Sequence, residues 1–284
     1  MLIGNAPCSW GVFYPMGNTI TADGYLDAIA RAGYEATELG PLGFLPTEPA
    51  KLEDALARRK LTLTGGAHVH TLAAPGTWPE LRASLDSLGI ILSTLDAPHL
   101  VLMDESEWYP RDQPGVVDEA GWKTMIGYVR DAQTHVRDTY GVELTFHPHV
   151  GTCVEFESQI DRLLEETDVN LCFDTGHHAF WNQDPVAYMR KNWERIGYMH
   201  LKNVDPKVRA RVLAGELGPN ESFAAGVMSP LTEGAVDIPA VISFLKEKRY
   251  DGPCVIEQDP SEDGDDPEQL AAKNLVYLKR LVTE

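Results

Sequence analysis

The chain is poor in basic residues. Its 284 residues contain 24 Lys and Arg against 43 Asp and Glu, which gives a formal net charge of -19. A surface of that sign repels nucleic-acid phosphates and anionic lipid surfaces, and the only dense basic run is KVRAR at 207–211. The composition therefore argues against nucleic-acid partners and favours a neutral or cationic small molecule as ligand.

Long apolar runs and paired cysteines are also missing. No window approaches the ~20 apolar residues of a membrane span, and the first residues have neither the basic nor the apolar region of a signal peptide. We therefore expect a cytoplasmic protein without a membrane partner. The cysteines form no CxxC pair, so we expect buried free thiols instead of disulfides or a zinc knuckle. They are Cys8, Cys153, Cys172 and Cys254.

The residues that are present suit a large α/β domain. Hydrophobic residues make up 43% and charged residues 24% of the chain, ordinary values for a protein with a real core. Apolar runs typical of strands lie at 2–5, 34–39, 61–68, 99–103, 142–147, 170–174, 196–201 and 254–257. Helical patterns lie at 21–33, 47–60, 78–95, 119–140, 155–167, 185–193, 238–248 and 268–281, the first two capped by Thr21 and Thr47.

Eight such strand–helix units without a strong linker predict one domain over residues 1–284, a (β/α)8 TIM barrel. A doubly wound open sheet is the alternative, but it would not readily gather polar groups from all eight strand ends. The segment at about 203–236 is longer than a usual connection between a strand and a helix. We expect a short helix at 208–213 and a lid over the site, with a plain surface insertion as the alternative.

Polar side chains stand at the ends of the expected strands, where barrels of this type carry their catalytic groups. They are Asn5, Glu38, His68, His147, Asp174, His200 and Glu257, followed just beyond by His70, His149, His177 and Lys202. The last four strands alone supply two imidazoles and two carboxylates, a set that suits Mn²⁺, Co²⁺, Fe²⁺ or Zn²⁺. Four protein ligands leave open positions only on a five- or six-coordinate ion, which favours Mn²⁺ or Co²⁺ over a closed tetrahedral zinc.

Each of these residues also has a plainer interpretation. A single strand-end histidine is commonly a packing residue, and Asp174 before Thr175 and Gly176 can cap the following helix. Glu257 can be a solvated strand end. Four ligand-type side chains at four successive strand ends nevertheless favour a metal site formed by His147, Asp174, His200 and Glu257.

Several segments resemble the xylose isomerase-like TIM barrels of the sugar isomerase/epimerase superfamily, and the similarity covers essentially the whole chain. They are IGNAP at 3–7, TELGPLGFLP at 37–46, HPHVGT at 147–152, FDTGH at 173–177, HLKNV at 200–204 and VIE at 255–257. The DTGH motif is specific only to the superfamily. The TELGP segment and the loop at 223–234 are similar to its inosose dehydratase branch.

The resemblance implies a divalent metal, commonly Mn²⁺ or Co²⁺, at the ends of strands five to eight, with Zn²⁺, Fe²⁺ or Mg²⁺ as alternatives. Many members carry Glu where this chain has His147, and His149 is the competing ligand. The implied substrate is a keto-cyclitol such as scyllo-inosose, or a keto-sugar. Barrels of this kind often associate, which leaves a homo-oligomer open.

The implied chemistry is an elimination. A metal ion that binds a ketone and the adjacent hydroxyl stabilises the enolate, so a base can remove the α-proton and an acid can protonate the departing β-hydroxyl. The candidates for acid and base are Glu257, His177, Lys202 and His68. The candidates for substrate contact are Asn5, Trp10, Glu38 and His149.

Other outcomes of the same site remain open. Reprotonation of the enolate on another carbon or face would make a ketose isomerase or epimerase, and elimination from a 3-keto-glycoside would make a related lyase. A trinuclear-zinc DNA repair endonuclease is disfavoured by the negative charge and by the missing Asp-x-His pair after strand seven. A sugar-binding protein without catalysis would not need four ligands.

Overall fold

Eight parallel strands close into a barrel in the computed structural model, which describes residues 1–109, 115–261, 264 and 266–284. Around the barrel the order is β1-β10-β7-β6-β5-β4-β3-β2. The strands are β1 (Leu2–Asn5), β2 (Ala36–Glu38), β3 (Thr62–His70), β4 (His99–Asp104), β5 (Glu143–His147), β6 (Asn170–Asp174), β7 (Ile196–Leu201) and β10 (Pro253–Ile256). Because β1 pairs with β10 from Leu2↔Pro253 to Asn5↔Ile256, the sheet has no open edge. The predicted TIM barrel is confirmed, and the open sheet is excluded.

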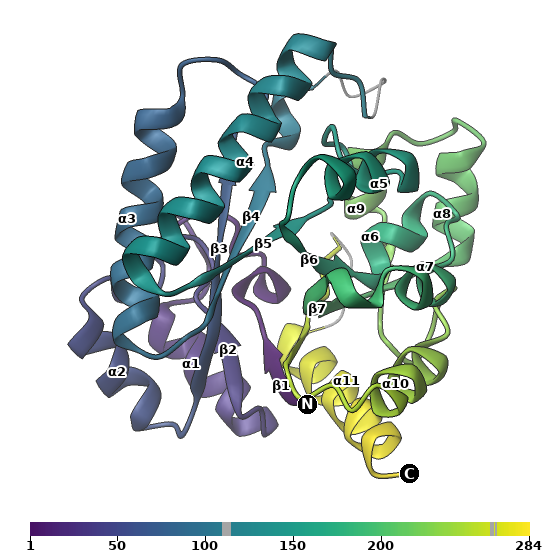
Figure 1. Cartoon of the computed structure of the whole chain (residues 1–284). Helices are drawn as coiled ribbons and strands as arrows, with labels where there is room; N and C mark the ends of the chain where they lie inside the picture. Colours follow the sequence, from purple (N-terminus) through teal and green to yellow (C-terminus); the bar gives the residue numbers. More distant parts are fainter. Residues whose placement is uncertain (110–114, 262–263, 265) are drawn as a thin grey trace.

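The outer layer of helices surrounds this barrel (Figure 1). Its main helices are α1 (Ala22–Ala32), α2 (Pro49–Ala57), α3 (Trp78–Thr94), α4 (Glu119–Tyr140), α5 (Glu157–Glu166), α7 (Pro185–Lys191), α10 (Ile238–Glu247) and α11 (Pro267–Thr283). Thr21 caps α1 as predicted, since its hydroxyl accepts from the Gly24 N–H at 3.1 Å. The predicted cap at Thr47 is wrong: α2 starts at Pro49, whose ring presets the backbone of a first turn, and Glu48 precedes it.

The long segment after β7 is folded. β8 (Asn203–Val204) pairs antiparallel with β9 (Met228–Ser229), and α8 (Pro206–Leu213) and α9 (Pro219–Ala224) lie between them in the chain. The helix predicted at 208–213 is confirmed and starts two residues earlier. The sequence patterns did not indicate α9, the β8–β9 pair or the short α6 (Thr175–Phe180) that follows β6 directly.

The barrel interior is filled by a small apolar cluster of its own. Its buried members are Ala6, Val101, Cys172, Tyr198 and Val255, and the partly buried Ala67 and Cys8 pack against them. Side chains alternate between the two faces of a strand, so residues two positions further along point to the same side. This periodicity directs Asp174, His200 and Glu257 toward the mouth of the barrel.

Two further sequence expectations concern the cysteines and membranes. All four cysteines are free; Cys153, Cys172 and Cys254 are buried and Cys8 is partly exposed. Among the described residues, no helix is long and apolar enough to cross a membrane.

Candidate active site

Four ligand-type side chains meet at the C-terminal mouth of the barrel. They are His147, Asp174, His200 and Glu257, all buried, with their donor atoms within 4.8 Å of one another. Asp174 Oδ2 lies 3.9 Å from both His147 Nε2 and His200 Nδ1, and His200 Nδ1 lies 3.3 Å from Glu257 Oε2. The structure therefore brings together the side chains that the sequence grouped from four different strands.

The donor geometry fits a divalent cation. Ligands at about 2.0–2.2 Å from an ion place neighbouring donor atoms roughly 3–3.5 Å apart; the separations of 3.3 and 3.9 Å lie within this range or a few tenths of an ångström above it. Asp174 Oδ2 and His200 Nδ1 are moreover buried without a hydrogen-bond partner. Buried polar atoms are nearly always satisfied in native proteins, so an ion at this position would satisfy both.

Asp174 serves two purposes through its two oxygens. Oδ1 accepts from the backbone N–H groups of Gly176 at 2.7 Å and His177 at 2.9 Å, and so caps α6. Oδ2 faces the other donors. The helix cap and the ligand geometry are therefore compatible, and the cap holds the carboxylate plane in place.

Glu38 orients His200. Its Oε1 accepts from His200 Nε2 at 2.7 Å, and both side chains are only 2% exposed. A carboxylate on one imidazole nitrogen fixes the ring so that the other nitrogen faces the donor group, as is usual for metal-binding histidines. The sequence suggested that Glu38 contacts substrate hydroxyls; the structure gives one of its oxygens to His200.

A buried ammonium stands beside the donor group. Lys202 Nζ lies 2.9 Å from Glu257 Oε2, 3.1 Å from Asp259 Oδ2 and 3.6 Å from Asp174 Oδ2. It also donates to His177 Nε2 at 3.0 Å. Without a metal ion, Lys202 and the protonated ring of His200 face four carboxylates, those of Glu38, Asp174, Glu257 and Asp259, so negative charge is in excess. A divalent ion that replaces the His200 proton would offset this excess. Asp259 was missed from the sequence, although it stands two positions after Glu257 and so on the same side.

The two carboxyl groups among the four donors, Asp174 and Glu257, have different pKa values because their surroundings differ. Burial raises the pKa of Asp174 to about 6, against the opposing effect of Lys202. Burial would also raise the pKa of Glu257, but the positive charges of His200 and Lys202 outweigh it and bring that pKa to about 2. These directions follow from burial disfavouring charge and from nearby opposite charges favouring it.

Two histidines beside the donors are neutral near pH 7. Burial, reinforced by the charge of Lys202, lowers the pKa of His149 to about 4. Burial, with His149 and Lys202 as neighbours, holds the pKa of His177 well below its usual range. Both rings are therefore neutral and can accept a proton, and the lowered pKa makes each a weaker base than a free imidazole.

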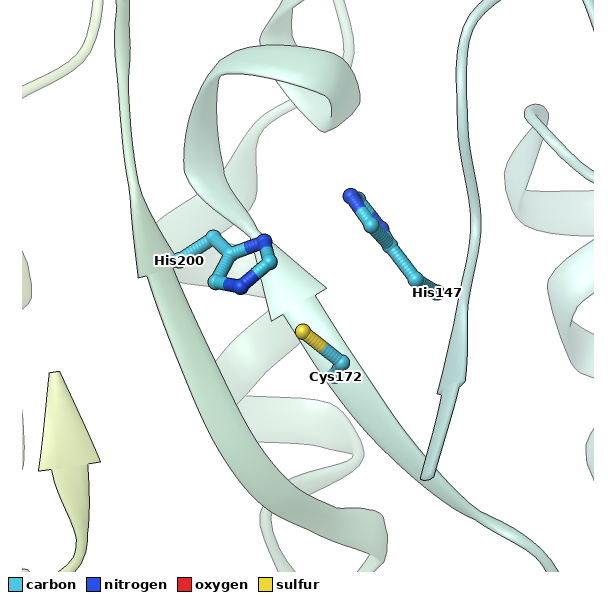
Figure 2. Close-up of side chains that lie close together, drawn as sticks. All are labelled: His147, Cys172 and His200. Atoms are coloured by element: carbon cyan, nitrogen blue, oxygen red, sulfur yellow. The ribbon is translucent and has the colours of Figure 1, made fainter. Parts of the chain in front are cut away.

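A thiol lies below the four donors. Cys172 precedes Asp174 by two residues on β6, and its sulfur points between the rings of His147 and His200 (Figure 2). These three side chains also bring their donor atoms within 4.8 Å of one another. Burial raises the pKa of Cys172 to about 12, so the group is a neutral thiol.

A cavity of about 150 Å³ opens above the donors. Its polar lining residues are Glu38, His147, His149, His200, Lys202, Glu257 and Asp259, which include most of the residues expected from the sequence. His177 does not line this cavity; it lies behind Lys202 and lines a small neighbouring one with His149 and Glu155.

Three predicted residues lie elsewhere. Asn5 is next to the inward-facing Ala6, so it points outward; it donates to the Ile256 carbonyl at 3.1 Å and lines a separate small cavity. His68 likewise follows the inward-facing Ala67 and stacks near His70. Trp10 packs edge-on against Tyr25, with ring centroids 5.1 Å apart. The structure brings none of the three into the cavity.

The comparisons with known proteins agree with this fold. The family model of xylose isomerase-like TIM barrels matches residues 26–281. An inosose dehydratase of Geobacillus kaustophilus is 27% identical over 293 residues, 99% of this chain and 94% of the relative. The rhizopine catabolism protein MocC of Rhizobium meliloti is 31% identical over 257 residues, 87% and 78% of the two chains. Among solved structures, the IOLI protein with a bound zinc atom has a TM-score of 0.76 at 14% identity, covering 100% of this chain and 98% of that one.

Proposed function

The chain belongs to the xylose isomerase-like TIM barrel family, and on that premise we propose that it is a metal-dependent dehydratase, a carbon–oxygen lyase. The proposed substrate is a keto-cyclitol such as scyllo-inosose, or a related keto-sugar. The observation that carries the proposal is the buried group of two imidazoles and two carboxylates at the barrel mouth, in which Asp174 Oδ2 and His200 Nδ1 have no hydrogen-bond partner. Near full-length similarity to inosose dehydratases supports the substrate class.

In this proposal the metal is held by His147, Asp174, His200 and Glu257. The mixed nitrogen and oxygen donors favour Mn²⁺ or Co²⁺, with Zn²⁺, Fe²⁺ or Mg²⁺ as alternatives. When bound, the ion supplies a Lewis acid that polarises the substrate carbonyl. Glu38 keeps the His200 ring in the required orientation.

His149 is the proposed base. Its Nδ1 lies 2.8 Å from the Val150 carbonyl oxygen, to which it donates, so the lone pair of the neutral ring is on Nε2. The ring is partly exposed and lines the cavity above the donors. It can therefore accept the α-proton of a substrate bound there.

Lys202 is the proposed acid. Its ammonium lines the cavity, and burial, which by itself lowers its pKa, is outweighed by Asp259, Glu257 and Asp174, so the pKa stays well above its usual range. The group is therefore charged near pH 7 and can deliver a proton to a departing hydroxyl. Its contact with His177 Nε2 at 3.0 Å offers a neighbouring site for the proton.

The segment from β8 to β9 is the proposed cover of the site. Phe223 of α9 stacks on Phe180 with centroids 6.1 Å apart and lies 6.2 Å from the His177 ring. An apolar cover over the ends of β6 and β7 would exclude water from the site. The electrostatic interactions among the buried charged groups would then be stronger.

One assay tests the reaction. Purified protein with added Mn²⁺ is incubated with scyllo-inosose in D₂O and followed by ultraviolet absorbance and NMR. We expect loss of water and the absorbance of an unsaturated ketone or its dione tautomer. Deuterium exchange without water loss would contradict the dehydratase and indicate an isomerase or epimerase, whereas binding without exchange would indicate a binding protein.

Metal content tests the ligands. Asp174→Ala and Glu257→Ala should lose at least tenfold in metal affinity, because each removes one of four donors. Glu165→Ala, on the exposed face of α5, is the matched control and should retain the metal. Stoichiometric metal in both site variants would overturn the ligand assignment.

A further inference from the structure

The cavity above the donor group has two unlike walls. The ends of β5, β7 and β10 contribute imidazole, ammonium and carboxylate groups, and the one polar residue from β2, Glu38, is paired with His200. The opposite wall comes from the ends of β1, β3 and β4 and from the loop after β1. Its apolar side chains are Ala6, Pro7, Val12, Phe13, Ala67, Val69, Val101 and Met103, and the thiol of Cys8 also lines the cavity on this side.

The apolar wall is continuous over two successive levels of the barrel. Ala67 of β3 is the register partner of Val101 on β4, and Val69 is the partner of Met103. All four side chains line the cavity. The backbone between β3 and β4 is paired in the parallel ladder, and none of these four side chains carries an N–H, O–H or carbonyl group that could pair with a hydroxyl.

Near the entrance the wall continues as exposed apolar surface. Phe13 lines the cavity and is 53% exposed, and Tyr14 and Met16 on the same loop are 65% and 81% exposed. A ring that carries hydroxyls on every carbon would turn several of them toward groups that cannot accept or donate. Buried polar groups without partners are costly, so an apolar group matches this wall better than hydroxyls on the ring edge that faces it.

We propose that the substrate carries an apolar group, such as an O-alkyl or O-aryl substituent, on the ring edge opposite its keto-hydroxyl pair. The keto-hydroxyl pair faces the polar wall, and the substituent lies against Val69, Val101 and Met103. This inference rests on the proposed function, because it refines the substrate of the same site. The occupant of the apolar wall is thus part of the substrate and not another protein.

A substrate panel tests the inference. Scyllo-inosose is compared with its O-methyl and O-benzyl ethers, with Mn²⁺ present, and water loss is measured for each by NMR. We expect kcat/KM to rise at least about tenfold for an ether, the effect of apolar groups in an apolar pocket. Water loss that is equal or faster for scyllo-inosose overturns the inference alone, whereas the absence of water loss from every compound overturns the proposed function.

Two variants assign the effect to the wall. Val69→Thr and Met103→Gln replace apolar groups by polar ones of similar size, so both should lower the ether preference at least threefold while metal content stays unchanged. Val276→Gln, at a 70% exposed position of α11, is the control and should leave the preference unchanged. An unchanged preference in both wall variants contradicts the inference.

A second copy of the chain is the competing occupant, and light scattering distinguishes it. If Phe13→Ser converts an oligomer into a monomer and leaves the substrate preference unchanged, the apolar surface serves association and the inference is wrong. If the preference falls and the mass does not change, the substrate occupies the wall.

Discussion

Glu155 is a buried carboxyl group behind the site and shows how strongly a single residue can respond to its surroundings. It is 2% exposed; Oε2 accepts from the Gly151 N–H at 2.9 Å and from Trp181 Nε1 at 2.6 Å, while Oε1 has no partner. Burial raises its pKa from 4.5 to about 7, although both hydrogen bonds act in the opposite direction. The folded state therefore binds this proton more tightly than the unfolded state does.

The consequence is a loss of stability as pH rises. A raised carboxyl pKa costs nothing below the unfolded value of 4.5, and the cost grows until the pH passes about 7. Glu155→Gln keeps an oxygen that can accept from Gly151 and Trp181 but cannot ionise. We expect it to gain about 1–3 kcal/mol in free energy of unfolding relative to the parent protein between pH 5 and pH 8.

Urea unfolding at several pH values measures this gain. Glu165→Gln, exposed on α5, is the control, and its stability should run parallel to that of the parent protein. If the free energy of unfolding of Glu155→Gln also changes with pH in parallel with that of the parent protein, the Glu155 carboxyl is not protonated in the folded state near neutral pH.

At the scale of elements, the side chain of Asn203 links β8 to the turn that follows β9. Asn203 Nδ2 donates to the carbonyls of Leu231 at 3.2 Å and Val236 at 3.3 Å, and Oδ1 accepts from the N–H groups of Val204 at 2.9 Å and Val236 at 2.8 Å. Gly234 passes so close that an added Cβ would stand 2.3 Å from Asn203 Oδ1. The fold of this segment, the proposed cover of the site, therefore depends on a buried amide and a glycine.

Asn203→Ala should lower the free energy of unfolding by about 2–4 kcal/mol, because it leaves several buried backbone groups without partners. Gly234→Ala should have a similar effect, since its φ of +142° and the lack of space both oppose a side chain. Denaturant unfolding gives the values. Glu233→Ala, which removes only the exposed ion pair with Lys273, should change stability by less than about 1 kcal/mol. A cost that small for Asn203→Ala would show that the segment is held by other contacts.

At the scale of the whole molecule, the four donors join strands that are neighbours in the barrel. The order β5, β6, β7, β10 is contiguous around the sheet, although the donors span the chain from residue 147 to residue 257. Global unfolding separates them, so an ion held by all four binds the folded state alone. In the proposed metal site, binding of the ion and folding would therefore be coupled.

Removal of the metal should lower the melting temperature by several degrees. A ligand at 100 times its Kd stabilises the folded state by about 2.7 kcal/mol. Thermal unfolding with excess Mn²⁺ and with EDTA measures the difference. Asp174→Asn keeps an oxygen to cap α6 but loses the anionic donor, so its melting temperatures with Mn²⁺ and with EDTA should nearly coincide. If this variant is stabilised by Mn²⁺ as much as the parent protein, the ion does not bind at Asp174.

The sequence by itself determined the barrel and the grouping of the four donors. Eight apolar runs separated by amphipathic helices permit few other closed arrangements, and parallel strands of a barrel bring their C-terminal ends to one mouth. His147, Asp174, His200 and Glu257 could therefore be grouped from the positions of strand ends alone.

Only the tertiary structure decided which way the other side chains point. A strand end does not say which face a residue occupies, and one position of difference turns it to the opposite side; this is why Asn5 and His68 lie outside the cavity. Two contacts of the site form only when the barrel closes: that of His200 with Glu38 and that of Lys202 with Asp259. The apolar wall likewise forms only when β3 pairs in register with β4, because that pairing brings the apolar side chains of the two strands side by side.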